Sequence, residues 1–316
     1  MKAFEHAMGV DPKTGPQGLS SSKPHEALNG SLGKGKDTAS TGIPGMPKSL
    51  SSVIKGIGLL MLLLLAQTAA ASPPTEPAEP PLPFQAGERL VFQARWEFIP
   101  AGEAVLEVLT SDSVGQTPAL HFAATAWSYP VIDLFYKVRN RIDAYTDRSV
   151  SRTLLYRERS EGRRPKDVTV TFDWERRKAQ YTNMDERRDP LPIQPGSLDP
   201  LSIFYAFRLE DLHVGAVLSG PVTDGKKCIT GTATVIRREK LQCAMGEIDT
   251  FLVEPSLEHV GGVFEKAKDA KIQVWVSADR YRIPVRLKSK VIIGSFIAEL
   301  IDVSGTDWPH RPKPQN

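Results

Sequence analysis

Three histidines lie in the part of the chain that we expect to fold, and histidine is the side chain best suited to proton transfer at neutral pH. His121 falls within an alternating run, His213 follows an amphipathic segment and His259 precedes a Gly-Gly pair. Their spacing matches no metal-ligand set, and the sequence contains no His-Glu-x-x-His, Gly-x-Ser-x-Gly or P-loop motif. We therefore expect no catalytic residue, no metal site and no cofactor, and we interpret His121 as a packed residue of a strand.

Two cysteines, Cys228 and Cys243, could form a disulfide bond. They are fifteen positions apart, with a strand-like segment over residues 229–238 between them. An even number of cysteines in an exported chain favours a bridge, which would contribute about 3 kcal/mol. Two buried free thiols are the alternative, and a metal site is disfavoured because no histidine or further cysteine lies near them in the sequence.

The densest group of basic residues lies between residues 157 and 188. Lysine and arginine at strand edges and in turns prevent sheets from aggregating, which is the structural explanation for this group. The functional alternative is contact with an anionic glycan or lipid headgroup. The candidates for such contact are Arg163, Arg164, Arg176 and Arg177.

Aromatic residues are the candidates for contact with an apolar ligand, because they combine a large apolar surface with a defined shape. Several lie in a connection over residues 128–136 that could form a helical turn or a lid. Others lie at strand ends and on the predicted helix, where packing in the core is the simpler interpretation for Tyr205. The ligand-lining candidates are Trp96, Trp127, Tyr129, Phe135, Tyr136, Phe204 and Tyr205.

Alternation of apolar and polar residues predicts a β-rich domain over residues 84–305. Residues 271–303 form two strands joined by a turn, followed by a third run interrupted at Gly294-Ser295, which predicts an antiparallel meander. The domain opens with a hairpin whose first strand, 87–98, is turned back by residues 99–102 into a second strand, 103–109. The other predicted strands are 119–127, 137–146, 152–159, 167–174, 178–183, 215–222, 226–230, 232–242 and 248–254.

One amphipathic helix is predicted over residues 199–209. Asp199 is suited to cap its N-terminus, and Pro200 would occupy the first helical position, where a missing N–H costs nothing. Its apolar face would carry Leu201, Phe204, Tyr205, Arg208 and Leu212. Many antiparallel strands with one such helix predict a large curved antiparallel sheet or open β-barrel, with the helix packed on or in it.

The composition is that of a soluble globular protein, with 41% hydrophobic and 24% charged residues among 316. The net charge of +3 comes from residues 1–71, which contain seven lysines and four acidic residues. The remainder carries 33 basic and 33 acidic groups, and this balance argues against nucleic-acid binding.

Residues 46–71 have the three parts of a signal peptide. Lys48 and Lys55 precede an apolar run over 56–66, and Ala-Ala-Ala follows at 69–71. The run is shorter than the roughly 20 residues of a membrane span, although an uncleaved anchor is an alternative. We expect export to the periplasm, contact with the membrane only through this segment, and a disordered extension or misassigned start over residues 1–45. Residues 72–83 form a Pro-rich leader, and residues 306–316 are expected to form a disordered tail.

Several segments together resemble one known family. They include residues 84–90, 96–102, 199–205 and 246–251, and above all Val-Trp-Val-Ser-Ala-Asp-Arg-Tyr-Arg-Ile-Pro-Val-Arg at 274–286 with Ile-Gly-Ser-Phe-Ile-Ala at 293–298. Over residues 84–305 the chain resembles the exported bacterial family catalogued as domain of unknown function 3108. It departs from the family at Asp199-Pro200, where the family often has Gln-Asp before Leu-Ser. The resemblance implies a mostly β envelope protein and no catalytic residues.

These observations favour a non-catalytic binding or carrier protein for an apolar or amphiphilic envelope component, such as a lipid or glycan. A carrier of this kind needs a cavity of about 300 Å³ or more. A structural or assembly module that docks on another envelope protein or an anionic glycan is an alternative. An envelope hydrolase is a third possibility, and it requires titratable groups to gather in a cleft.

Overall fold

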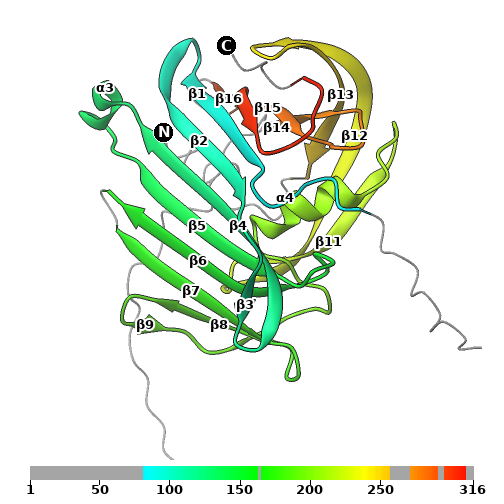
Figure 1. Ribbon diagram of the computed structural model, residues 1–316. Helices are drawn as coiled ribbons and strands as arrows, with labels where there is room; N and C mark the ends of the chain where they lie inside the picture. Colours follow the sequence, from blue (N-terminus) through cyan, green and yellow to red (C-terminus); the bar gives the residue numbers. More distant parts are fainter. Residues whose placement is uncertain (1–80, 163–164, 257–270, 291–294, 311–316) are drawn as a thin grey trace, which may run out of the picture. The chain divides into compact units, whose positions relative to one another are not determined.

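The computed structural model of the protein describes residues 81–162, 165–256, 271–290 and 295–310 (Figure 1). The predicted signal peptide, the extension before it and most of the Pro-rich leader lie outside the described residues. The same is true of Arg163, Arg164, His259 and Gly294. From Leu82 onward the described residues belong to one compact unit.

Antiparallel strands make up most of the described chain. The strands are β1 (Arg89–Trp96), β2 (Ile99–Val108), β3 (Asp112–Val114), β4 (Thr117–Ser128), β5 (Arg139–Thr146), β6 (Thr153–Glu161), β7 (Lys166–Asp173), β8 (Lys178–Asn183), β9 (Glu186–Arg187), β10 (Leu191–Pro192), β11 (Val217–Thr223), β12 (Cys228–Cys243), β13 (Gly246–Pro255), β14 (Lys271–Ser277), β15 (Pro284–Lys290) and β16 (Ser295–Ser304). The helical segments are α3 (Pro130–Asp133), α4 (Ser202–Ala206) and the 3₁₀ turn η2 (Phe207–Leu209).

The strands form one sheet in the order β10-β8-β7-β6-β5-β4-β2-β1-β16-β15-β14-β13-β12-β11, with β3 paired to β4 and β9 to β8. The predicted opening hairpin is β1–β2, and the predicted closing meander is β14–β15–β16. Strand β1 also pairs with β16, from Arg89 opposite Ser304 to Trp96 opposite Phe296. The first and last strands therefore lie side by side in the middle of the sheet.

Two strand boundaries differ from the prediction. The β1–β2 turn is formed by Glu97 and Phe98, and Ile99 already begins the second strand. Glu97 adopts a φ of 53°, a left-handed conformation that a tight hairpin turn requires. The two runs predicted at 226–230 and 232–242 are a single long strand, β12, because Gly231 continues the pairing with β11.

The predicted helix is shorter than expected. Asp199 caps the turn that leads into the helix, because its Oδ1 accepts hydrogen bonds from the backbone N–H groups of Leu201 (2.8 Å) and Ser202 (2.9 Å), and the N-cap position of the helix itself is Leu201. The α-helix itself covers only Ser202–Ala206, and the chain tightens into η2 before it becomes extended at Glu210. Serine, isoleucine and aromatic residues are modest helix formers, so this segment depends on tertiary packing for its stability.

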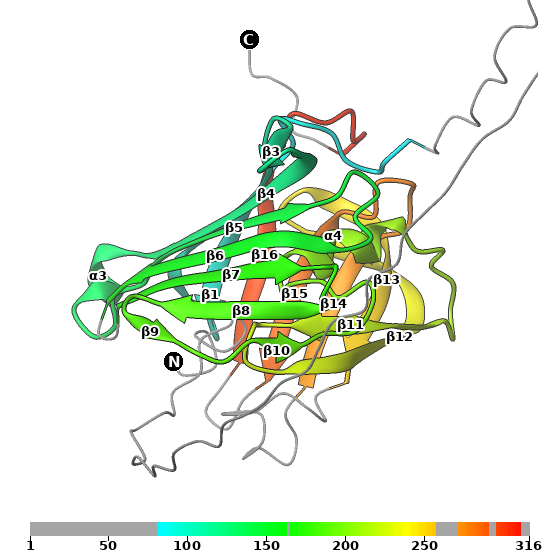
Figure 2. The ribbon, with the colours of Figure 1, turned by 90° about the horizontal axis from the view of Figure 1, so that it is seen from below.

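Helix α4 lies on the inner side of the curved sheet (Figures 1 and 2). Tyr205 stacks on Phe122 of β4 with ring centroids 4.0 Å apart, and Phe84 packs edge-on against both rings. Beyond the helix, Leu212 packs with Val235, Phe251 and their neighbours on β12–β14. The expected curved sheet around a core helix is therefore confirmed.

Among the described residues the terminal strands of the sheet, β10 and β11, do not pair with each other, and other contacts join the two ends. Leu198 forms an isolated bridge with Val222 of β11. The β11–β12 turn rests on β7 and β8, where a Cβ at Gly225 would lie 2.8 Å from Val170 Cγ2 and 3.3 Å from Tyr181 Cβ. Gly225 also has a φ of +81°, so glycine is required there for two reasons.

Two further predictions need correction. Cys228 and Cys243 are free thiols at opposite ends of β12, and at about 3.3 Å per residue they are far beyond the 7 Å limit for a disulfide bond. They also pack against different core clusters. The folded region does not end at residue 305, because Trp308 is fully buried and donates its Nε1–H to Asp279 Oδ2 (2.7 Å).

A buried ion pair links three distant parts of the chain. Arg208 in η2 donates from Nη2 to Glu88 Oε2 (3.0 Å), and both side chains are at most 1% exposed. The same guanidinium donates to the carbonyl oxygens of Pro83 (3.2 Å) and Tyr281 (3.0 Å) and lies 5.1 Å from the ring centroid of Phe84. The helix end is thereby attached to the entry of β1 and to the β14–β15 turn.

The substitution Glu88→Gln should lower the free energy of unfolding by about 3–5 kcal/mol, because it leaves the buried guanidinium of Arg208 without its counter-ion. Urea denaturation monitored by tryptophan fluorescence measures this change. As a control, Arg176→Ala removes an exposed pair with Asp173 and should have no measurable effect. A loss below about 1 kcal/mol for Glu88→Gln would contradict the burial of this pair.

Candidate functional site

A histidine–carboxylate pair is present on β4 and β5. His121 Nε2 lies 2.9 Å from Asp143 Oδ1, and its ring stacks on Tyr145 with centroids 4.2 Å apart. Burial alone would raise the pKa of Asp143, but hydrogen bonds from His121 and Arg141 outweigh it and lower the pKa to about 2. The ring of His121 contacts Asp143 and Tyr145, and neither of them is the serine or cysteine nucleophile of a hydrolytic triad.

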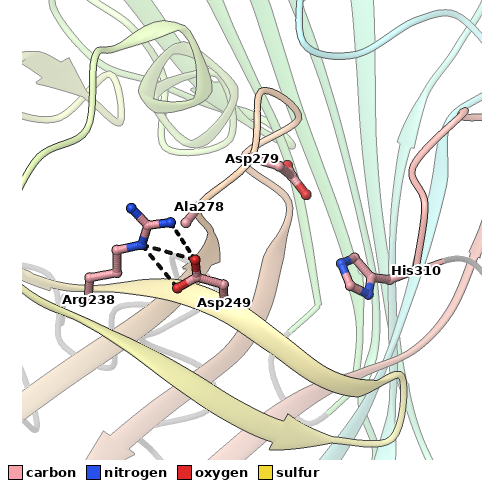
Figure 3. A pocket seen from close by; sticks show the side chains of 5 residues that line it. All are labelled: Arg238, Asp249, Ala278, Asp279 and His310. Atoms are coloured by element: carbon pink, nitrogen blue, oxygen red, sulfur yellow. Dashed lines mark hydrogen bonds and ion pairs between the residues drawn. The ribbon is translucent and has the colours of Figure 1, made fainter.

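A small polar hollow lies beside the β14–β15 turn (Figure 3). It encloses about 200 Å³, less than a typical ligand pocket, and is lined by Arg238, Asp249, Ala278, Asp279 and His310. Arg238 and Asp249 form a two-armed ion pair. Asp279 caps the turn through the N–H of Tyr281 and also holds Trp308. These acidic groups already serve the fold, and none of the seven predicted ligand-lining residues lines this hollow.

A polar group on β6 and β7 is buried. The Tyr156 hydroxyl donates to Glu158 Oε2 (3.3 Å), and Lys166 Nζ lies 3.5 Å from Glu158 Oε1. Burial raises the pKa of Glu158, and the nearby lysine opposes that rise only in part. Burial also raises the pKa of Tyr156. This group is a buried ion pair within the wall of the sheet, and Glu158 Oε1 has no hydrogen-bond partner among the described residues.

The structure divides the seven predicted ligand-lining residues into two groups. Tyr205 is buried in the core, where its hydroxyl has no hydrogen-bond partner among the described residues, and burial raises its pKa. Phe204 is partly buried beside it. The remaining five lie at one edge of the sheet, where β1 and β4 end and the connection to β5 begins: Trp96, Trp127, Tyr129, Phe135 and Tyr136.

Large apolar side chains that the sequence did not suggest as ligand contacts are exposed at the same end of the strands. Eleven large apolar side chains are exposed among the described residues, and six of them lie in the β1–β2 turn and in the α3 connection. Phe98 is 86% exposed, Leu134 81% and Phe135 74%. We call these six residues, which lie at the ends of central strands and in the connections beyond them, the apolar edge: Trp96, Phe98, Ile99, Val131, Leu134 and Phe135.

Strand register brings the two segments of the apolar edge together. Gly102 of β2 pairs with Ser128, the last residue of β4, and the N–H of Tyr129 donates to the carbonyl of Ala101 (3.0 Å). A Cβ at Gly102 would lie 2.1 Å from the carbonyl oxygen of Trp127, so only glycine permits this approach. Figure 1 shows α3 and the β1–β2 turn at the same upper edge of the sheet.

A polar clamp holds α3 in position. Arg139 forms a two-armed ion pair with Asp133, through Nη2 to Oδ2 (2.6 Å) and Nη1 to Oδ1 (3.2 Å). The buried Ser128 hydroxyl donates to Asp133 and accepts the N–H of Val138 (2.8 Å). These bonds from Arg139 and Ser128 lower the pKa of Asp133. Because the polar groups of α3 are bonded inward, Val131, Leu134 and Phe135 remain exposed to solvent.

Tyr129 provides a second polar attachment at the base of α3. Its hydroxyl donates to Glu103 Oε1 of β2 (2.8 Å). Burial, followed by this hydrogen bond to the carboxylate, raises the pKa of the phenol. The ring therefore stays neutral and fixed at the end of β4.

The two anionic-contact candidates that the structure describes, Arg176 and Arg177, are not part of the apolar edge. Arg176 and Arg177 lie in the turn between β7 and β8, where Arg176 pairs with Asp173. The α3 connection is at the opposite end of these strands, where Arg139 of β5 pairs with Glu161 of β6. Basic residues at this turn are consistent with the structural explanation of charged strand ends.

A known family matches most of the folded region. The family described as "Protein of unknown function (DUF3108)" matches residues 91–301. The chain belongs to the DUF3108 family. The match covers β2–β15 in full and most of β1 and β16, so the apolar edge and its clamp lie within the DUF3108 region.

Two solved structures are similar to this DUF3108 chain, each with a TM-score below 0.5. A β-barrel-like protein of the DUF1849 domain from Brucella abortus is 11% identical, with a TM-score of 0.44, covering 69% of this chain and 98% of that one. A protein with a YmcC-like fold from Bacteroides fragilis is 9% identical, with a TM-score of 0.31, covering 71% of this chain and 98% of that one. No curated protein matches the sequence.

Within the described part of the DUF3108 chain, no helix is both long and apolar enough to cross a membrane. No three residues among His, Cys, Asp and Glu gather in a way that could hold a metal ion in the described ranges.

The raised pKa of Glu158 predicts a pH-dependent difference between the wild type and Glu158→Gln. The native state retains a proton above the ordinary carboxyl value of 4.5, so Glu158 contributes less to stability as the pH rises through its raised pKa. The unfolding free energy of Glu158→Gln relative to the wild type should therefore increase from pH 4 to pH 7. Denaturation curves at both values test this, and a constant difference would contradict the buried state of Glu158.

The clamp predicts that Asp133→Asn loosens α3 and leaves the core unchanged. The amides of Asp133 and Tyr136, which donate to the carbonyls of Tyr129 and Ile132, should exchange with deuterium faster. Amides of β5 should keep their protection. Because the pKa of Asp133 is lowered, the wild-type clamp should persist below pH 3.8 and open only as the pH falls through the lowered value. Unchanged exchange at α3 would show that the clamp is dispensable.

Proposed function

We propose that this DUF3108 protein acts by binding an apolar or amphiphilic component of the cell envelope, without catalysis, and that the apolar edge is its contact surface. The observation that carries the proposal is the exposure of Phe98, Leu134 and Phe135 on two connections at the same end of the strands. Leaving such side chains in water is unfavourable, and grouped exposed apolar residues are typical of interaction sites.

The polar clamp supports this proposal. A loop with three large apolar residues would lower its free energy by folding them onto the sheet. The Asp133–Arg139 pair and the Ser128 hydroxyl instead hold the loop in one conformation with these residues outward. A preformed apolar surface loses less conformational entropy when it binds than a mobile loop would.

The chemistry of the described groups is also better suited to binding than to reaction. His121, Glu158 and Asp279 each have partners that stabilise the fold. Five of the seven aromatic residues that the sequence nominates for ligand contact lie at or beside the apolar edge. We place the binding surface at this edge, whereas the carrier hypothesis from sequence required an internal cavity.

Titration with dodecylphosphocholine below its micelle concentration tests the proposal. The wild type should bind this single-chain amphiphile in isothermal titration calorimetry. The double variant Phe98→Ser, Phe135→Ser should bind at least about tenfold more weakly, because two large apolar contacts are lost. The variant Val214→Ser, Val217→Ser removes exposed apolar side chains elsewhere and should bind like the wild type. Equal binding by all three proteins would refute a role for the edge.

A further inference from the structure

The apolar edge is shaped as projecting tips, and this distinguishes it from a pocket or a flat interface. The exposed fraction of the side chain increases toward the tip of the β1–β2 turn, from 37% at Trp96 to 86% at Phe98. On the α3 connection the most exposed residues are Leu134 at 81% and Phe135 at 74%. Projecting apolar tips fit a deformable apolar phase, whereas a protein partner would need a matching cavity for each tip.

The chemical order of the side chains along each connection gives a second argument. Aromatic residues with a polar atom, Trp96, Trp127 and Tyr129, lie at the strand ends. Purely apolar residues, Phe98 and Leu134, lie beyond them in the turns. Tryptophan and tyrosine favour the headgroup level of a bilayer, and aliphatic and phenylalanine side chains favour the hydrocarbon below it. The edge therefore matches the polarity gradient of a lipid surface.

The charges on the α3 connection give a third argument. Asp133 and Arg139 neutralise each other through two hydrogen bonds, so α3 brings no uncompensated charge from this pair toward the lipid. Lys137 is exposed on the same connection, and its long side chain can keep the ammonium group at the level of the lipid phosphates.

We propose that the apolar edge inserts into the surface of a lipid bilayer, with Phe98, Leu134 and Phe135 below the headgroups and the ring of Trp96 at their level. This inference rests on the proposed function and specifies its partner as a lipid surface. The β-sheet remains outside the bilayer and presents its edge to it. The clamp on α3 fixes the angle at which the tips enter.

Flotation with vesicles of equimolar phosphatidylethanolamine and phosphatidylglycerol tests this inference on the exported chain from residue 72 onward, so that the predicted signal segment does not contribute to binding. The wild type should float with the vesicles. The triple variant Phe98→Ser, Leu134→Ser, Phe135→Ser should bind at least about tenfold more weakly, and Val214→Ser, Val217→Ser should bind like the wild type. Matching urea denaturation curves would show that the triple variant is folded.

Quenching by brominated lipid tests the depth of insertion. Tryptophan fluorescence of the wild type should be quenched by vesicles that contain lipid brominated on the acyl chain, and the double variant Trp96→Phe, Trp127→Phe should lose most of this quenching. Equal flotation of the triple and control variants would overturn the inference, as would quenching that persists in this double variant.

The two proposals can fail separately. If the wild type does not float but its binding of dodecylphosphocholine still depends on Phe98 and Phe135, the edge binds single lipids or another partner, and the bilayer inference is overturned. If neither vesicles nor the monomeric amphiphile bind through the edge, both proposals are refuted.

Discussion

The buried ion pair between Arg208 and Glu88 is the interaction on which the curved sheet depends. An open antiparallel sheet must cover its inner apolar face, and here a helix of only five residues helps to do so. Such a short helix is unstable alone. Arg208 fixes its end to the entry of β1 and to the β14–β15 turn, and the stacked rings of Tyr205 and Phe122 fix its other side. The strands on both sides of β1 and β16 can therefore curve around one element.

The apolar edge shows the same use of polar bonds to hold an otherwise unfavourable arrangement. Side chains such as Phe98 and Leu134 would be expected inside a soluble protein. Ser128, Asp133 and Arg139 satisfy one another beneath α3, so the connection cannot collapse onto the sheet without breaking charge-assisted hydrogen bonds. The stability of the fold and the exposure of the edge are therefore separate properties, and mutations can change one without the other.

The sequence was a good guide to the strands and a poor guide to their ends. Period-two alternation predicted the β1–β2 hairpin and the β14–β16 meander because each strand buries one face. It placed the first turn too late, because Phe98 continues the alternation although it lies in the turn. It also suggested a bridge between Cys228 and Cys243, because spacing along the chain does not reveal that one extended strand separates them.

The order of residues by itself determined the fold class, the family and the aromatic character of the connection before β5, since these follow from local periodicity and motif. Only the tertiary structure decided that β1 pairs with β16, that Arg208 meets Glu88, and that the β1–β2 turn and α3 lie at the same end of the strands. The reason is physical: these contacts join segments far apart in the chain, and their partners are selected by the curvature of the whole sheet. A single apolar residue in a turn is unremarkable, and it becomes part of a surface when the register places other such residues next to it.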